Sequence, residues 1–571
     1  MSALASSWND SLIVDEVPHI GAGYSYVVKG DMRLNPEHPP LVKDLAGLAL
    51  LPLGLNQNAF SLPQWTKETN GQWTFGRALI YGTGNDPDTV THAARLPMLL
   101  IFALAMALVW RWGRERAGVT GGLLGLIVFG FSPTVLAHAR FVTTDVAAAM
   151  GSLLATYAFV HYLRAPSRKT FWYSVLGLGV AFLCKFNTVL LGPLFVAAAL
   201  LWSWQTHGAS MRSMALWVGR TALVGFGAIA LVVWPVYALH TLGYPAQRQR
   251  ADTEAILGSY STSPLNNAVV WMSDKPVLRS LGQWGLGLAM VQQRSAGGNT
   301  IYWLGSVVKE GGPWYFPIVY ILKEPLAWLI LMALALGGLL HHARRGTPVS
   351  RTHFFDEKVW LMWIALYWAV SVQSTLNIGV RHLLPIYPFM ALLVSGQLAR
   401  LVDWVSTHEP RRLRLFEGSL VVLVAWYIFS SASVFPHYLS YFNQLAGGPS
   451  NGHHYVVDSN LDWGQDAKRL GVWADANNIP KVCLDYFGWA DPQAWLNDRY
   501  VWTSSTHWAD SNDFRKRNQC DGWVAVSATF FQNSNGIKTF SDDSNKNTWR
   551  WLMDYTPRAV IGNSIFVWHI E

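Results

Sequence analysis

The sequence has 571 residues, of which 51% are hydrophobic and 14% charged, with 30 tryptophans and a formal net charge of +8. Its three cysteines exclude a disulfide-rich scaffold, and the composition is typical of a membrane protein with several spans and aromatic belts at the interfaces. The basic residues lie mostly in short loops between apolar runs, which argues against a nucleic-acid partner.

The N-terminal region, residues 1–92, contains no apolar run long enough to cross a bilayer, which takes about 20 residues. Residues 1–14 also lack the basic start and the apolar core of a signal peptide. The run 39–55 is apolar but too short to span. It is predicted either as a helix lying along the membrane interface or as an ordinary helix packed on neighbouring spans.

Ten apolar runs predict membrane-spanning helices in the region 93–434, which makes the fold class an α-helical polytopic membrane protein. They lie near 93–113, 118–138, 139–163, 170–186, 188–206, 214–240, 316–340, 358–376, 383–405 and 416–434. The sequence shows no internal repeat, which counts against transporter folds built from two matching halves.

The charges of the connecting loops predict how the spans are oriented. One alternating set of loops holds most of the cations: Arg111, Arg114, Arg116, Arg164, Arg168, Lys169, Arg212, Arg344, Arg345, Arg351, Arg411, Arg412 and Arg414. By the positive-inside rule these loops are cytoplasmic. The N-terminal region, the loop 241–315 and the tail 435–571 are then extracytoplasmic. An outward N-terminal region requires either a missing first helix, which we favour, or translocation of the short N-terminus as a tail.

The two longest outward segments differ in character. Residues 241–315 form a loop rich in glycine, tryptophan and serine, which we expect to be ordered over a site. In the tail 435–571, strands are predicted at 481–488, 523–531 and 559–570 and a helix at 464–478, so the tail is predicted to be a small α/β domain. Cys483 and Cys520 could pair in an oxidising compartment; the alternative is two unpaired thiols.

Acidic residues and histidines gather near the start of the chain. Asp15 and Glu16 come first, and the stretch "NPEHPP" then carries Glu37 and His38. One interpretation is a solvated polar loop. The prolines, however, restrict the backbone, and rigid loops that hold carboxylates beside a membrane suit catalysis better than tethering. We therefore predict a functional role for this region.

Charged residues also occur where the predicted outward loops meet the spans. They are Arg140 with Asp145, Lys185, Lys323 with Glu324, and Arg381 with His382. Charges at such depths are costly and often mark a site, although a single lysine or arginine can also snorkel to the nearest headgroup. Several cations on the side that otherwise avoids positive charge predict a shared anionic ligand, for which a lipid phosphate is the natural candidate.

Four motifs carry a family resemblance: "DEVPHIGAGYSYVVKGDMRLNPEHPP", "ARFVTTD", "YFPIVYILKEP" and "NIGVRHLLPIYP". In this order they resemble the polyprenyl-phosphate-dependent glycosyltransferases of the GT-C fold, closest to the protein O-mannosyltransferase and lipid A aminoarabinose transferase group. The resemblance implies an inverting transfer from a lipid-linked sugar to an acceptor protein, lipid or glycan. It also implies that Asp15 is the catalytic base with Glu16 as its partner. Two departures are the missing first span and a tail unlike the sugar-binding domain of eukaryotic mannosyltransferases.

The residues suit this chemistry independently of the resemblance. A sugar phosphate already has a good leaving group, so a base and cations suffice, whereas a glycoside hydrolase needs two carboxylates flanking the bond. The predicted ligands of the donor phosphate are Arg140, Lys185, Lys323, Arg381 and His382. Glu37, His38 and Asp145 are predicted to contact substrate, and together with Asp15 they could hold a divalent cation, although no spacing in the sequence requires a cofactor.

The tail motif "DSNLDWGQD" begins like a calcium loop, with Asp458, Asn460 and Asp462, but its glycine falls one position late and position 12 is Arg469. We expect these side chains to cap turns and the following helix. The motif also resembles the acceptor motif of oligosaccharyltransferases, which we keep as an alternative.

Two other classes of protein stay open. A transporter or flippase of lipid-linked sugars would need polar residues through the membrane midplane, and a sugar-binding membrane protein would tolerate loss of Asp15. For all three classes we predict an integral protein of a bacterial inner (plasma) membrane.

Overall fold

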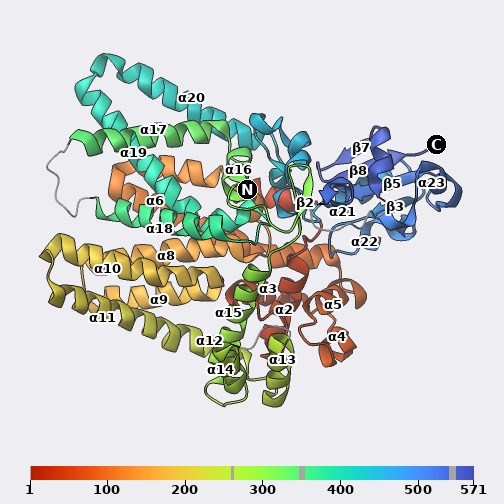
Figure 1. The fold of residues 1–571 in the computed structure, drawn as a ribbon, viewed down its shortest axis with the longest axis horizontal. Helices are drawn as coiled ribbons and strands as arrows, with labels where there is room; N and C mark the ends of the chain where they lie inside the picture. Colours follow the sequence, from red (N-terminus) through yellow and green to blue (C-terminus); the bar gives the residue numbers. More distant parts are fainter. Residues whose placement is uncertain (1, 259–262, 346–353, 539–547) are drawn as a thin grey trace.

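The computed structural model describes residues 2–258, 263–345, 354–538 and 548–571. The predicted cytoplasmic residue Arg351 and the side chains of Arg344 and Arg345 lie outside the described part. The molecule is elongated, with a bundle of long helices on one side and the sheet of the tail on the other (Figure 1). The N-terminal region lies between these two parts, and the C-terminus lies at the far end of the tail.

The N-terminal region is a folded helical unit rather than an open loop. Its helices are α1 (Ser2–Ser7), α2 (Glu16–Lys29), α3 (Leu41–Leu50), α4 (Pro63–Thr66) and α5 (Gln72–Arg77), with short turns η1 (Leu51–Leu53), η2 (Asn58–Ser61) and η3 (Ala78–Gly82). Residues 16–26 of α2 are all buried, so the interpretation as a solvated polar loop is wrong for this helix.

Glycines let α2 and α3 approach each other closely. A β-carbon on Gly23 would lie 2.0 Å from the carbonyl oxygen of Lys43, and one on Gly47 would lie 2.3 Å from that of Gly23. The predicted interfacial run 39–55 is thus a helix packed on α2, and its opposite face leaves Leu48 and Leu51 exposed by 49% and 46%.

All ten predicted spans are helical. The helices are α6 (Pro87–Gly130), α7 (Pro133–His138), α8 (Thr144–Arg164), α9 (Arg168–Cys184), α10 (Leu191–His207), α11 (Met211–Ala228), α12 (Trp234–His240), α16 (Tyr315–Lys323), α17 (Leu326–Arg345), α18 (Phe355–Gln373), α19 (Tyr387–His408) and α20 (Leu413–Ala432). The short helical segments η4 (Phe186–Leu190), η6 (Val380–Ile386) and η7 (Pro410–Arg412) precede α10, α19 and α20, and the π-helical segment η5 (Ile229–Val233) joins α11 to α12 in one continuous helix.

The helix α6 contains two of the predicted spans. Its backbone leaves helical geometry at Ala117 and Gly118. A β-carbon on Gly113 would lie 3.1 Å from the Cα of Gly122, whereas nine residues along a straight helix span about 13.5 Å. The chain therefore reverses at Gly118 and forms two packed antiparallel arms.

By length and composition, six helices among the described residues could cross a membrane, and the pair α16–α17, bent by 112°, would make a seventh. The prediction of ten spans is higher for three reasons. The helix α6 holds two spans, α9 has only 17 residues, and α18 begins with the charged residues 356–358.

The segment 241–315 is ordered as we expected, outside the undescribed residues 259–262. It forms α13 (Ala246–Gly258), α14 (Pro264–Met272), α15 (Arg279–Gly297) and the antiparallel strands β1 (Ile301–Trp303) and β2 (Ser306–Val308). The strand β2 pairs in parallel with β6 (Ile537–Lys538) of the tail, so this segment and the tail share a small sheet.

The tail is an α/β domain built on a five-stranded sheet in the order β4-β3-β5-β8-β7. Its strands are β3 (Val482–Asp485), β4 (Tyr500–Trp502), β5 (Trp523–Ser527), β7 (Ala559–Ile561) and β8 (Ile565–His569), and its helices are α21 (Ala467–Ala476), α22 (Gln493–Leu496), α23 (Ser511–Arg517) and α24 (Ala528–Asn535). Short turns of the tail are η8 (Tyr438–Ser440), η9 (Gln444–Ala446), η10 (Pro449–His454), η11 (Asp458–Asn460), η12 (Asn497–Arg499), η13 (Ser505–His507) and η14 (Trp549–Asp554).

Two strand predictions in the tail are corrected. The run 523–531 is a strand only to Ser527, because α24 begins at Ala528. The run 559–570 is a β-hairpin rather than one strand, with a tight turn at Gly562 and Asn563, both of which have positive φ angles. Both runs have the apolar content of strands, and only the turn residues distinguish a hairpin from a single strand.

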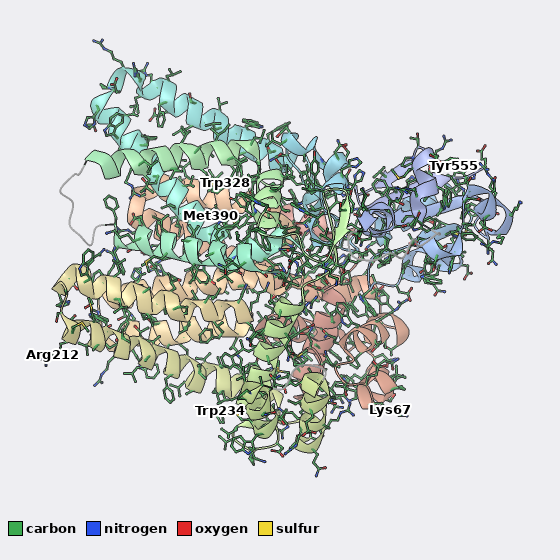
Figure 2. The ribbon with its side chains drawn as sticks, in the orientation of Figure 1. Lys67, Arg212, Trp234, Trp328, Met390 and Tyr555 are labelled. Atoms are coloured by element: carbon green, nitrogen blue, oxygen red, sulfur yellow. A yellow bond between two sulfur atoms is a disulfide. The ribbon has the colours of Figure 1, made fainter. Side chains whose placement is uncertain are left out.

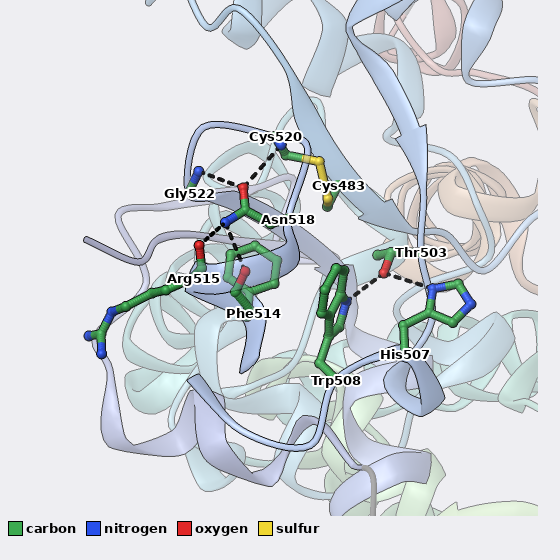
Figure 3. Close-up of a disulfide and its surroundings, with 9 residues drawn as sticks. All are labelled: Cys483, Thr503, His507, Trp508, Phe514, Arg515, Asn518, Cys520 and Gly522. Carbon is green, nitrogen blue, oxygen red and sulfur yellow. Dashed lines mark hydrogen bonds between the residues drawn. A yellow bond between two sulfur atoms is a disulfide. The ribbon is translucent and has the colours of Figure 1, made fainter. Parts of the chain in front are cut away.

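Cys483 and Cys520 form a disulfide that joins β3 to the loop before β5 (Figure 3). Asn518 orders this loop, because its side-chain oxygen accepts the backbone N–H groups of Cys520 and Gly522. Cys184 is buried in α9 and takes no part.

Candidate active site

A cavity of about 180 Å³ lies where the N-terminal region, α15 and the ends of the membrane helices meet. Its polar lining includes Asp15, His19, Glu37, His38, Lys185, Arg294, Arg381 and His382. Its apolar wall includes Phe186 and Leu190 of η4 and Tyr367 and Val370 of α18. The cavity therefore presents cations and carboxylates beside an apolar surface.

Asp15 stands at the N-cap of α2, but its carboxylate makes no capping hydrogen bond. Its Oδ2 atom instead accepts from Nη1 of Arg381 at 2.9 Å. The Oδ1 atom has no hydrogen-bond partner in the described part of the chain, and the side chain is 20% exposed to the cavity. One carboxylate oxygen is thus fixed while the other is available to a substrate hydroxyl.

A second carboxylate, Asp145 in the first turn of α8, holds the two main cations of the cavity. Its Oδ1 lies 2.5 Å from Nζ of Lys185, and its Oδ2 lies 3.3 Å from Nη1 of Arg381. Asp145 is fully buried and does not line the cavity. It therefore acts behind the cations, orienting both of them toward the space that Asp15 also faces.

Burial favours the neutral form of two histidines of the cavity, His19 and His38. Burial lowers the pKa of His19, although the nearby Asp15 opposes this shift. Burial and the neighbouring His19 and Lys43 lower the pKa of His38 well below its ordinary value. The positive charge facing the cavity therefore comes from Lys185, Arg294 and Arg381, and not from His19 or His38.

The loop that carries Glu37 and His38 is anchored by Lys43 of α3. Its Nζ donates to the carbonyl oxygens of Asn35 and His38 at 2.8 and 2.7 Å, and burial lowers the pKa of Lys43 to about 7. Glu37 accepts from Gln72 at 3.2 Å and lies 3.6 Å from Arg294. The rigid loop expected from its prolines is thus held by hydrogen bonds to its backbone as well.

Four of the predicted site residues do not line the cavity: Asp145, which lies behind its cations and not where it was predicted to contact substrate, and three more. Glu16 is buried in an ion pair with Arg95. Arg140 pairs with Asp10 at 3.0 Å and donates to the carbonyl oxygen of Pro436 at 3.1 Å. Lys323 donates to the carbonyl oxygens of Leu439 and Asn460 at 2.7 and 2.6 Å. Glu16, Arg140 and Lys323 are therefore bound to other groups of the protein and do not face the cavity.

Some residues at the site could not be predicted from the sequence motifs. Arg294 reaches the cavity from α15 of the long loop, and in the tail Ser459 and Trp463 contact Arg381 from behind. The tail motif "DSNLDWGQD" was the available signal, since it gathers polar residues that no helix or strand pattern requires. Burial raises the pKa of its Asp458 to about 6, against the opposing charge of Arg381.

The residues proposed as metal ligands are divided among other partners. Asp145 binds cations, and Glu37 contacts Gln72 and Arg294. Within the described ranges, no three His, Cys, Asp or Glu side chains converge as a metal site would require.

The family model for dolichyl-phosphate-mannose-protein mannosyltransferase matches residues 88–234, which contain Arg140, Asp145 and Lys185. No curated protein sequence matches the chain significantly. The solved protein O-mannosyltransferase Pmt1–Pmt2 complex of S. cerevisiae, bound to the sugar donor, is similar with a TM-score of 0.52 and 13% identity. That alignment covers 76% of this chain and 88% of the yeast chain.

Two further structures align over most of this chain at lower similarity. ArnT from Cupriavidus metallidurans, bound to undecaprenyl phosphate, has a TM-score of 0.46 and 12% identity over 99% of this chain and 96% of its own. The oligosaccharyltransferase of Archaeoglobus fulgidus, in complex with Zn and sulfate, has a TM-score of 0.46 and 12% identity over 94% and 69%. The predicted GT-C fold is confirmed by the likeness to the yeast complex.

Proposed function

We propose that this membrane protein with the GT-C glycosyltransferase fold is an inverting glycosyltransferase that moves a sugar from a polyprenyl-phosphate carrier to an acceptor hydroxyl. The observation that carries the proposal is the placement of one available carboxylate, Asp15, beside two cations, Lys185 and Arg381, in a cavity with an apolar wall. Those are the groups that such a transfer needs.

In the proposed step, the free Oδ1 of Asp15 accepts the proton of the acceptor hydroxyl as the hydroxyl oxygen attacks the anomeric carbon. The bond from that carbon to the phosphate oxygen breaks, and the electron pair leaves with the phosphate, so polyprenyl phosphate is released. Attack from the face opposite the phosphate inverts the anomeric centre. No general acid is needed because the phosphate is already a good leaving group.

The cations have the complementary task of stabilising the phosphate on which charge develops. Lys185 and Arg381 are already oriented by Asp145, so little reorganisation is required when the donor arrives. Because these residues supply positive charge, we expect transfer to continue in the presence of a chelator. The apolar side chains of Phe186, Leu190 and Val370 are suited to the first isoprene units of the carrier.

The identity of the sugar, hexose or pentose, and of the acceptor, whether protein, lipid or glycan, are outcomes of the test. We propose an extracytoplasmic site in a bacterial inner membrane. Two observations support this orientation. Arg212, in one of the cation-rich loops, lies at the end of the bundle away from the tail (Figure 2), and the tail contains a disulfide, which persists mainly in oxidising compartments.

The test is transfer and donor binding by the purified protein, supplied with polyprenyl-phosphate hexoses and pentoses and an acceptor extract. Asp15→Asn should lower the transfer rate by roughly 10²–10⁴, the usual loss for a general base, while donor binding survives. Arg381→Ala should weaken donor binding and also slow transfer. Asp475→Asn, at a carboxylate that is 67% exposed on the tail, is the matched control for Asp15→Asn.

Each result has a clear meaning. Transfer by Asp15→Asn at the unmodified rate would refute the assignment of the base. Unchanged donor binding by Arg381→Ala would refute the phosphate site. Movement of the intact lipid-linked sugar across vesicles without transfer would favour the flippase alternative.

A further inference from the structure

The tail segment 458–467 lies directly behind the cavity and is bound to both sides of it. On one side its backbone holds the residues that precede Asp15. The N–H of Val14 donates to the carbonyl oxygen of Trp463 at 2.9 Å, and that of Ser11 donates to the carbonyl oxygen of Gln465, also at 2.9 Å. The loop that presents Asp15 therefore rests on this segment.

On the other side the segment holds the turn that carries Arg381. Ser459 donates its hydroxyl to the carbonyl oxygen of Ile378 at 2.6 Å. The side-chain oxygen of Asn460 accepts the backbone N–H of Val380 at 2.9 Å, and its nitrogen donates to the hydroxyl of Tyr315 at 3.0 Å. The start of η6 is thus fixed by two consecutive side chains of the tail.

The guanidinium of Arg381 is held on three sides. Its Nε donates to the hydroxyl of Ser459 at 3.1 Å, and its carbon lies 4.2 Å from the ring centre of Trp463. Its Nη1 is shared by Asp15 and Asp145. In the described part of the chain no residue accepts a hydrogen bond from Nη2, although Arg381 lines the cavity.

Gly379 makes this arrangement possible. A β-carbon at this position would lie 2.3 Å from the Ser459 hydroxyl. Only a glycine lets the tail come close enough for that hydroxyl to bind both Ile378 and Arg381. The motifs "NIGVRH" and "DSNLDWGQD" are therefore in close contact at one pair of residues, Gly379 and Ser459.

We propose that Ser459 and Trp463 are positioning residues that fix the Arg381 guanidinium, so that its unpaired Nη2 is presented to the phosphate of the donor. This inference rests on the proposed function. Two carboxylates attract the same guanidinium, so without a fixed Nε and a ring against its face it could rotate toward Asp145 and withdraw Nη2. The tail, which carries both residues, is then part of the active site and not an appended module.

The experiment compares matched substitutions in the purified full-length protein. Ser459→Ala removes the acceptor of Nε and should lower kcat/KM for the donor about tenfold or more, since hydrogen bonds to charged groups are worth that much. Trp463→Phe keeps an aromatic face against Arg381, which Trp463→Leu removes, and should therefore retain more activity than Trp463→Leu. Gly379→Ala should reproduce the loss caused by Ser459→Ala.

The decisive measurement is a double-mutant cycle with Arg381→Gln, read out as transfer and as binding of polyprenyl phosphate. If Ser459 and Trp463 act through Arg381, then Ser459→Ala and Trp463→Leu should change either readout less than about twofold once Arg381 is gone. If Ser459 and Trp463 had a purely structural role, their substitutions would lower transfer and binding by the same factor in the unmodified protein and in Arg381→Gln. Trp502→Leu, at an exposed tryptophan of β4, is the control for changes to the tail.

Equal losses with and without Arg381 would overturn the inference, as would equal activities of Trp463→Phe and Trp463→Leu. Full activity of Ser459→Ala would overturn it as well. Failure of the proposed function has a different signature, because the unmodified protein itself would then neither bind polyprenyl phosphate nor transfer sugar.

Discussion

Replacing Glu16 with glutamine is expected to destabilise the whole N-terminal region. The Glu16 carboxylate is fully buried and accepts four hydrogen bonds. Two come from the guanidinium of Arg95, at 2.5 and 2.8 Å, and two from the backbone N–H groups of Ile13 and Val142, both at 3.0 Å. Arg95 also donates to the carbonyl oxygens of Ser7, Asp10 and Ser11.

The size of the effect follows from what glutamine leaves behind. It removes the negative charge, so the buried Arg95 loses its only carboxylate contact in the described chain. Each carboxylate oxygen accepts two of the four bonds, so the amide NH2 that replaces one oxygen sets two of these donors against a donor. Breaking a buried pair by removing one partner typically costs about 3–5 kcal/mol. At about 1.4 kcal/mol per tenfold change, this is a shift of roughly 10²–10⁴ in the folding equilibrium.

The assay is thermal unfolding of the purified protein in detergent, together with its half-life at a fixed raised temperature. The matched control is Glu254→Gln, which breaks the exposed pair of Glu254 with Arg250 and should change little, since such pairs contribute about 0–1 kcal/mol. Adding Arg95→Met to Glu16→Gln should recover part of the loss, because it removes the uncompensated charge.

Unfolding of Glu16→Gln at the temperature of the unmodified protein would show that the Glu16–Arg95 pair does not stabilise the fold. Loss of transfer with unchanged unfolding would be especially informative. It would mean that Glu16 acts in the chemistry, as its place beside Asp15 suggests, and that the Arg95 pair does not hold the fold.

Three further predictions concern the tail and the helix packing. Burial raises the pKa of Asp485 to about 6, so ionisation of this carboxylate lowers the stability of the fold as the pH rises above about 4. Asp485→Asn should therefore raise the unfolding temperature at pH 8 but not near pH 4, and an equal effect at both pH values would contradict this. Joint replacement of Cys483 and Cys520 by serine should destabilise the tail by about 4 kcal/mol for a separation of 37 residues, seen as a lower denaturant midpoint. Gly47→Ala should lower the unfolding temperature because its β-carbon meets backbone, whereas Gly192→Ala, with open space around it, should not.

Hydropathy was sufficient to locate the membrane helices, because a span must bury apolar side chains over its whole length. All ten predicted runs are helical, including the two arms of α6, which the loop charges at Arg114 and Arg116 mark as a reversal. The tail was harder. Short apolar runs look alike in strands and helices, so the end of β5 at Ser527 and the β7–β8 turn were not predictable from their composition.

At the site, the sequence could predict which residues are charged and near the membrane but not what each charge faces. Asp15, Lys185 and Arg381 come together as expected from their shared predicted side. Arg140 and Lys323 have the same sequence signature yet bind internal carbonyl groups. A cation that binds phosphate and a cation that binds backbone carbonyl groups can stand at similar positions relative to an apolar run, so position in the sequence cannot separate them.

The partners of those two cations also explain how the tail is joined to the bundle. Arg140, which also pairs with Asp10, donates to Pro436, and Lys323 donates to Leu439 and Asn460, so the backbone of residues 436–460 accepts hydrogen bonds from two cations that the membrane domain buries. Lys323 finds no carboxylate ion pair in the described chain, and an unsatisfied buried ammonium would be costly. The contact of Lys323 with Asn460, which helps to hold the tail in place, is therefore adjacent in sequence to the contact of Ser459 with Arg381. Arg140 and Lys323 thus hold the tail in place, and the tail in turn carries Ser459 and Trp463, which are proposed to orient Arg381 toward the donor phosphate.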